Sequence, residues 1–213
     1  MRTLLACGAV AGPLFVIVGF GQAFTRQGFD LTRHPLSVLS NGDLGWLQIA
    51  NFLVSGLLVV AGAIGMRRAL RGGRGGTWGP LLIAVYGLGL VAAAIFRADP
   101  MDGFPPGTPP GPPAAISTFG LLHFVAAAIA FFSLIAACFV FARRFGALGE
   151  RGWAAYSAAT GLIFFAAFAG IASGGGQPVF GVAFAVAVVL AWAWLSAMAL
   201  RLMGKAASGQ TLA

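Results

Sequence analysis

Two histidines and a few charged side chains are the residues of this sequence best suited to chemistry. Arg33 and His34 are adjacent, Arg97 and Asp99 share a second polar segment, and His123 lies just inside an apolar stretch. Imidazole and carboxylate groups exchange protons or bind divalent cations, whereas guanidinium groups bind carboxylates and phosphates. If these three segments meet in space, they could bind an anion, move a proton or hold a metal ion.

A second polar feature is a short series of uncharged side chains within another apolar stretch. Gln48, Asn51 and Ser55 are spaced by three and four residues, so they lie on one face of an α-helix. Amide groups are costly to expose to lipid, and we expect this face to turn toward other helices or a wet cavity. Hydrogen bonding between helices and ligand binding both remain open for it.

The composition indicates which scaffold must position these residues. Of the 213 residues, 59% are hydrophobic and 8% are charged, and the mean hydropathy is +0.92. A soluble domain carries roughly a quarter charged residues. Six apolar stretches free of Asp, Glu, Lys and Arg are long enough to cross a bilayer, at 4–24, 46–66, 78–96, 119–142, 153–173 and 179–200. The sequence therefore predicts an all-α fold, an integral membrane bundle of six transmembrane helices that forms one domain over residues 1–213.

The charged residues divide unequally between the two sides that six spans define. One side has ten basic residues and a single acid, Glu150, and the other has three arginines and four aspartates. The positive-inside rule then places both termini in the cytoplasm. We interpret the net charge of +8 as a topology signal and an attraction to anionic headgroups, and we expect no nucleic-acid partner. Twelve arginines against one lysine, with abundant Ala and Gly, are typical of a GC-rich bacterial gene, which indicates a bacterial inner membrane.

Two long segments, 25–45 and 97–118, connect the spans on the less basic side, and long loops often carry function. Within the second, residues 104–113 read FPPGTPPGPP. Proline removes backbone donors and fixes φ, which excludes helix and strand and favours polyproline II or turns. We interpret this piece as a stiff spacer, with docking to a partner protein as the alternative.

Three local patterns concern the helix ends and contacts. Ser40 and Asp43 have the spacing of a capping box that would open the second span. Gly8 and Gly12 have the spacing of a close helix contact. Residues 174–178 read GGGQP and predict a tight turn between the last two spans.

The topology places both histidines, all four aspartates and three arginines at the same membrane level, and three interpretations of this coincidence are open. The charges could form a structural network. Arg33 and Arg97, with a histidine, could hold a lipid phosphate or another anionic headgroup. His34, Asp99 and His123 could hold a divalent cation such as zinc, although they come from three separate segments without a metal-binding spacing.

Three stretches of the chain resemble the domain of unknown function 998 family, whose members are small multi-pass prokaryotic membrane proteins. They are HPLSVLSNGDLGWLQIANF at 34–52, FRADP at 96–100 and GLLH at 120–123. The resemblance implies a helical membrane bundle and suggests that the three stretches belong to one pattern. It brings no established activity, cofactor or substrate.

We therefore predict a membrane protein that binds, senses or moves a lipid-like or other anionic small molecule at an outward-facing polar site, with membrane lipid as its surroundings. The site would comprise Arg33, His34, Gln48, Asn51, Arg97, Asp99 and His123. No cofactor is expected. One alternative is a metal-assisted membrane hydrolase in which His34, Asp99 and His123 hold a divalent metal, and a further alternative is a structural or assembly subunit of a membrane complex.

Overall fold

The computed structural model describes residues 1–70, 75–173 and 177–207. These residues form six α-helices and one short 3₁₀ helix, and their only β pairing is an isolated bridge between Met101 and Phe104. In chain order the elements are α1 (Arg2–Thr25), η1 (Leu36–Ser40), α2 (Gly45–Ala69), α3 (Trp78–Ile95), α4 (Thr118–Ala147), α5 (Arg151–Ala172) and α6 (Pro178–Ala207). The predicted all-helical fold is confirmed for this part of the chain.

All six α-helices are long and apolar enough to cross a membrane, which confirms the six predicted spans. The boundaries differ most where a helix continues past its apolar stretch. α4 ends at Ala147 rather than at 142, and α6 ends at Ala207 rather than at 200. Helical geometry persists there because long basic side chains can reach headgroups and water from the end of a helix. The basic residues in these extensions are Arg143, Arg144, Arg201 and Lys205.

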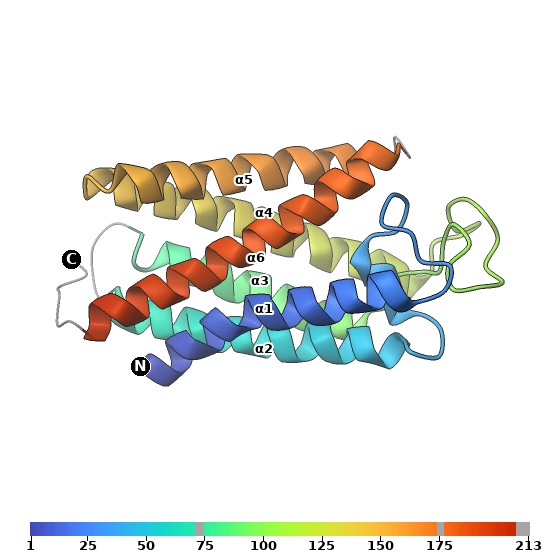
Figure 1. The fold of residues 1–213 in the computed structure, drawn as a ribbon, viewed down its shortest axis with the longest axis horizontal. Coiled ribbons are helices and arrows are strands. Elements are labelled where there is room, and N and C mark those ends of the chain that lie inside the picture. The colour runs from blue at the N-terminus through green and yellow to red at the C-terminus, as the bar shows by residue number, and fades with distance from the viewer. Residues whose placement is uncertain (71–74, 174–176, 208–213) are drawn as a thin grey trace.

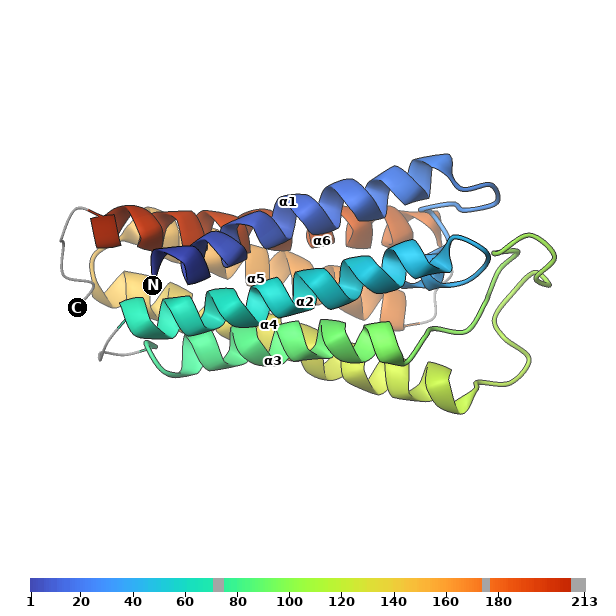
Figure 2. The same cartoon turned by 90° about the horizontal axis from the view of Figure 1, so that it is seen from below.

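The helices form a closed ring in which each packs against its neighbours in sequence (Figures 1 and 2). α1 packs on α2, α2 on α3, and so on to α6, which packs back on α1. Figure 1 shows α6 crossing the bundle obliquely, beside α5 at one end and toward α1 at the other. The oblique path of α6 therefore closes the ring.

Glycines permit the closest helix approaches. A Cβ on Gly56 of α2 would lie 2.7 Å from the carbonyl oxygen of Gly87 on α3, and a Cβ on Gly87 would lie 2.9 Å from that of Gly56. The predicted close contact at Gly8 and Gly12 is confirmed, since both glycines approach α6 and Gly8 also approaches α2. Gly8 lies against Gly62 of α2, and a Cβ on Gly12 would lie 2.8 Å from the carbonyl oxygen of Trp192 on α6.

The two ends of the bundle differ in chemistry. α1 begins and α6 ends at the same end (Figure 1), which we call the cationic end. The basic residues described there are Arg2, Arg67, Arg68, Arg143, Arg144, Arg151, Arg201 and Lys205. The opposite end, which we call the loop end, carries segments 26–44 and 96–117. Three predicted features lie outside the described residues: Arg71, Arg74 and the glycines of the turn at 174–176.

The predicted capping box at Ser40 is wrong. Ser40 is the last residue of η1, and its hydroxyl donates to the carbonyl oxygen of Ser37 instead of accepting from α2. α2 begins at Gly45 and has no side-chain cap. The intervening Gly42 has φ +72°, a left-handed turn that separates η1 from α2 and removes Ser40 from the capping position.

Candidate functional site

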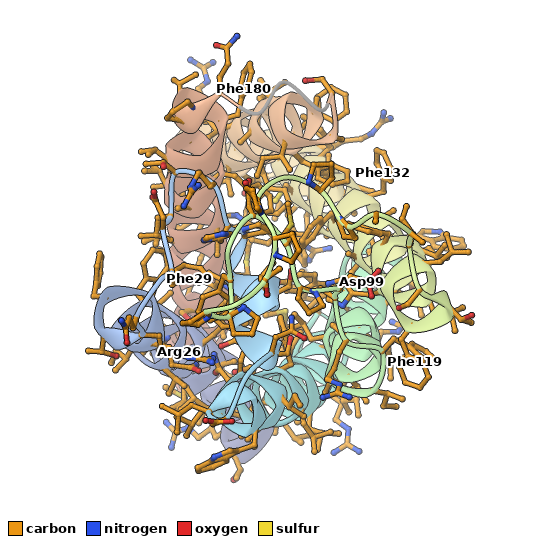
Figure 3. The ribbon with its side chains drawn as sticks, turned by 90° about the vertical axis from the view of Figure 1, so that its right-hand side faces the viewer. Arg26, Phe29, Asp99, Phe119, Phe132 and Phe180 are labelled. Carbon is orange, nitrogen blue, oxygen red and sulfur yellow. The ribbon has the colours of Figure 1, made fainter. Side chains whose placement is uncertain are left out.

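His34 joins the two long segments of the loop end, which Figure 3 shows face on. Its Nδ1 accepts a hydrogen bond from the backbone N–H of Asp30 at 2.9 Å, and its Nε2 lies 3.1 Å from the carbonyl oxygen of Asp102. Because Nδ1 accepts, this pattern assigns the ring proton to Nε2. The imidazole is buried beside the rings of Phe29 and Phe104. Nδ1 therefore fixes the ring within its own loop, and Nε2 joins that loop to the other.

Arg26, which directly follows α1, fastens the same loops from the other side. Its guanidinium donates to the carbonyl oxygens of Leu39 at 2.5 Å and Asn41 at 2.6 Å, and lies 4.9 Å from the ring centroid of Phe104. Burial lowers the pKa of Arg26, and the nearby charge of Asp43 opposes this. An arginine remains protonated nonetheless. The sequence marked Arg26 only as a loop charge, because nothing in its spacing signals two carbonyl partners.

The two arginines predicted to meet an anion are both exposed, but their partners differ. Arg33 lies 3.5 Å from a carboxylate oxygen of Asp30 and 3.9 Å from one of Asp102. Its side chain is 46% exposed, so these ion pairs are weak and screened by solvent. Thr32 donates from its side chain and backbone to Asp30 and thereby lowers the pKa of that carboxyl. Arg97 has no hydrogen bond or ion pair with any residue that the structure describes.

Asp99 lies just after the end of α3, and His123 lies near the start of α4. The Asp99 carboxylate accepts from the Ser117 backbone N–H at 2.9 Å and from its hydroxyl at 2.6 Å. The Ser117 hydroxyl in turn caps α4 by accepting from the N–H of Gly120 at 2.9 Å. His123 places Nδ1 2.8 Å from the carbonyl oxygen of Phe96, and Asp99 interacts with the ring electrostatically. These contacts fix the start of α4 against the end of α3.

The polar face of α2 turns inward, as its spacing predicted. Gln48 is fully buried, and its side-chain oxygen accepts from Gln22 of α1 at 2.9 Å and from Asn51 at 3.3 Å. Asn51 also donates to the carbonyl oxygen of Phe15, and Ser55 donates to Asn51. Gln22 also belongs to this hydrogen-bond network, although the sequence did not single it out. One polar residue near a helix end does not indicate which residue it will contact.

The predicted site residues thus lie in separate groups. Gln48 and Asn51 belong to the α1–α2 amide network, Arg33 and His34 to the joined loops, and Asp99 and His123 to the α3–α4 junction. Within the described ranges, no three His, Cys, Asp or Glu side chains converge as a metal site would require. The alternative set of His34, Asp99 and His123 is divided between the loops and the α3–α4 junction.

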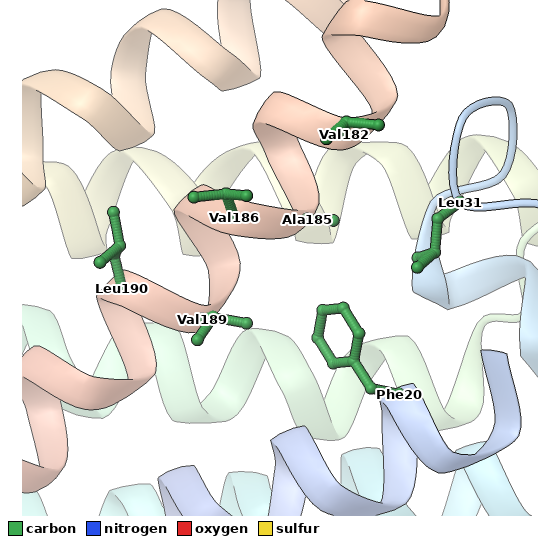
Figure 4. Close-up of a pocket in the computed structure, with 7 residues that line it drawn as sticks. All are labelled: Phe20, Leu31, Val182, Ala185, Val186, Val189 and Leu190. Atoms are coloured by element: carbon green, nitrogen blue, oxygen red, sulfur yellow. The ribbon is translucent and has the colours of Figure 1, made fainter. Parts of the chain in front are cut away.

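An apolar groove of about 290 Å³ lies between α1 and α6 in the half of the bundle toward the loop end (Figure 4). Its lining residues are Phe20, Leu31, Val182, Ala185, Val186, Val189 and Leu190. Ligand pockets start at roughly 300 Å³, so the volume suits one hydrocarbon chain better than a bulky molecule. Val182 and Val186 are exposed, so the groove opens sideways, toward the lipid that would surround a membrane bundle.

One end of the groove lies at Leu31, in the loop between α1 and α2, which His34 joins to the loop between α3 and α4. The backbone of this loop packs on Gly181 near the start of α6, where a Cβ would lie 2.5 Å from the carbonyl oxygen of Thr32 and 2.6 Å from that of Leu31. Arg33 follows two residues after Leu31. The segment that closes the end of the groove therefore also carries an exposed guanidinium.

The comparisons with known proteins agree with the resemblance seen in the sequence. A family model described as a protein of unknown function, DUF998, matches residues 9–201. No curated protein and no solved structure matches the chain. Because the match covers all six helices, at least in part, and both long loops, the chain belongs to the DUF998 family.

Proposed function

We propose that this protein is a multi-pass protein of the bacterial inner membrane that binds, senses or moves a lipid-like anionic molecule at its loop end. Both termini would be cytoplasmic, because the sequence assigns ten of its 13 basic residues to this side and cytoplasmic loops are enriched in Lys and Arg. The loop end, with its groove, would then face outward.

The observation that carries the proposal is the apolar groove between α1 and α6. Its lining is entirely hydrocarbon, and it opens sideways at Val182 and Val186. An acyl or isoprenoid chain fits such a surface because burial of apolar area is its main source of affinity. Leu31 forms one end of the groove, so a chain lying in it would bring its headgroup to the loops.

Arg33 would meet that headgroup. Its ion pairs with Asp30 and Asp102 are long, at 3.5 and 3.9 Å, and half-exposed, so a phosphate or carboxylate can compete with them. Arg97 adds a second exposed guanidinium at the same end. His34, Asp99, His123, Gln48 and Asn51 would act by positioning the loops and helices, because each of them already has at least one hydrogen bond to a protein partner.

Photo-crosslinking tests the groove. The protein is reconstituted with a phosphatidylglycerol that carries a diazirine in its acyl chain, and labelled peptides are mapped. We expect labelling around Ala185 that is lost in Ala185→Trp, which fills the groove. Ala193→Trp is the matched control, since Ala193 is an exposed alanine of the same helix outside the groove. Equal labelling of both variants would refute chain binding in the groove.

The headgroup assignment needs a second comparison. Arg33→Gln should reduce labelling by phosphatidylglycerol and leave labelling by the matching phosphatidylcholine unchanged. An equal loss with both lipids would contradict a charge contact. For the orientation, a cysteine placed at Thr108 should react with a membrane-impermeant maleimide in intact cells, and one placed at Leu148 should react only after lysis. The reverse pattern would overturn the cytoplasmic termini.

A further inference from the structure

A compact group of charges at the cationic end lies far from the groove. Glu150, between α4 and α5, accepts hydrogen bonds from Arg201 and, at 2.7 Å, from Lys205, both on α6. Arg144 of α4 also interacts electrostatically with Glu150. Two cations therefore contact one carboxylate, and a third lies within electrostatic range of it. The four aspartates all lie in the loop-end segments, so Glu150 is the only acidic side chain at this end.

Arg201 has the features of an anion-binding arginine. Its guanidinium lies 4.7 Å from the ring centroid of Trp153 and 5.4 Å from that of Phe145, so two aromatic rings hold it in position. Its side chain is 19% exposed, and its Nε is a buried donor without a hydrogen-bond partner. A planar guanidinium fixed in this way offers paired N–H groups to a phosphate or carboxylate.

The position of the group suits a lipid headgroup. Trp153 lies near the start of α5, and aromatic side chains near helix ends are typical of the headgroup level of a membrane. Basic pockets between transmembrane helices on the cytoplasmic side bind the headgroups of anionic lipids. Here α6 is joined to the α4–α5 connection by the ion pairs of Arg201 and Lys205, so the group lies between helices.

We propose that Arg201 and Lys205, with Arg144 beside them, form a binding site for the phosphodiester headgroup of an anionic phospholipid, and that Glu150 is its internal competitor. The carboxylate holds the two α6 cations when no headgroup is bound. A phosphodiester displaces the carboxylate from one or both of these cations. The excess of basic over acidic side chains at this end attracts the anionic headgroup. This site is separate from the groove at the loop end, and it rests on the function proposed above only for the cytoplasmic orientation of the cationic end.

Substitution of the competitor and of a cation should have opposite effects. Glu150→Gln removes the competing charge and nearly keeps the size of the side chain, so phosphatidylglycerol should bind about fivefold more tightly. Arg201→Gln should weaken its binding by about the same factor. A purely structural salt bridge would give no gain in lipid affinity in Glu150→Gln.

Native mass spectrometry of the detergent-solubilised full chain, titrated with phosphatidylglycerol or phosphatidylcholine, measures these affinities. Arg68→Gln is the matched control, since Arg68 is an exposed arginine at the same end, on α2. We expect phosphatidylglycerol affinity to rise in Glu150→Gln, to fall in Arg201→Gln and to be unchanged in Arg68→Gln, with no change for phosphatidylcholine.

Three results would overturn the proposal. An unchanged or lower phosphatidylglycerol affinity in Glu150→Gln would exclude competition. An equal loss in Arg68→Gln and Arg201→Gln would show attraction by the whole cationic end and not a site. Displacement of phosphatidylglycerol by millimolar inorganic phosphate would assign the site to a free anion. If Arg201→Gln does not fold, Glu150→Gln still decides the first of these.

Discussion

The Nε2 of His34 lies 3.1 Å from the carbonyl oxygen of Asp102, a residue 68 positions further along the chain. This single contact joins the loop between α1 and α2 to the loop between α3 and α4. The ring is buried, and its other nitrogen is also occupied by backbone. The residue type of His34 suggests proton exchange or cation binding, but in the structure this side chain connects two loops.

Replacement of His34 by Leu should loosen the loop end. The change leaves the N–H of Asp30 and the carbonyl of Asp102 without their side-chain partner, which costs about 1–3 kcal/mol of unfolding free energy. Proteolysis within residues 97–117 should become faster, and the unfolding temperature should fall. Arg97→Gln should change neither measurement, because the side chain of Arg97 is exposed and without a polar partner among the described residues. Unchanged proteolysis in His34→Leu would show that the loops do not depend on this ring.

Asp99 should contribute to stability through the start of α4. Asp99→Ala removes the acceptor of both Ser117 hydrogen bonds, and we expect a loss of about 1–2 kcal/mol. Since Ser117→Ala removes the cap and one of the same bonds, the loss in the double variant should be smaller than the sum of the single losses. Thermal unfolding measures this, with the exposed Asp43→Asn as control. Strict additivity would mean that the two side chains act independently.

The amide pair between α1 and α2 should behave as a unit. Gln48→Leu removes one of the two acceptors of the Nε2 group of Gln22 and leaves only the carbonyl oxygen of Val18, at 3.2 Å, so we expect a cost of about 1 kcal/mol. Gln22→Leu together with Gln48→Leu removes both polar groups, so the double variant should be more stable than the two single losses predict. Chemical denaturation provides the comparison, and the exposed Gln27→Leu is the control. Additive losses would show that no coupling exists between the two amides.

The attachment of α6 to the α4–α5 connection should depend on pH. Burial raises the pKa of Glu150, but hydrogen bonds and charges from Lys205 and Arg201 outweigh it and bring the pKa below its ordinary value of 4.5. A lowered folded-state pKa gives a stabilisation that is complete above about pH 4.5 and is lost as the pH falls below it. The difference in unfolding temperature between wild type and Glu150→Gln should therefore shrink as the pH falls from 6 to 3. A difference at pH 3 that is as large as at pH 6 would contradict this assignment.

The helices could be predicted from the sequence because their cause is local. A stretch of about 20 residues without a charged side chain has only one stable backbone arrangement in lipid. The inward face of α2 was predictable for the same reason, since the spacing of Gln48, Asn51 and Ser55 fixes their common side. Ser40 was wrongly predicted to cap α2, because its hydroxyl bonds within the short helix η1. The η1 turn itself depends on packing between loops.

The candidate site was less predictable because it depends on distant contacts. His34 and Arg26 bond mainly to backbone carbonyls, which every residue has, so no residue type marks their partners. The groove arises from the oblique crossing of α6, and its lining residues look like any other lipid-facing residues in the sequence. Only the three-dimensional arrangement distinguishes Ala185 in the groove from Ala193 outside it.

The closed ring of helices has a consequence for how the protein is made. The groove is lined mainly by α6, with Phe20 of α1 facing it, and these two helices are the last and the first of the six to leave the ribosome. Helices α1 to α5 can pack on one another in order as they enter the membrane. The surface of α1 that contacts Trp192 stays uncovered until α6 is inserted. The groove therefore forms only at the final step of assembly, and a chain that stops before α6 would lack the surface on which we propose that a lipid chain lies.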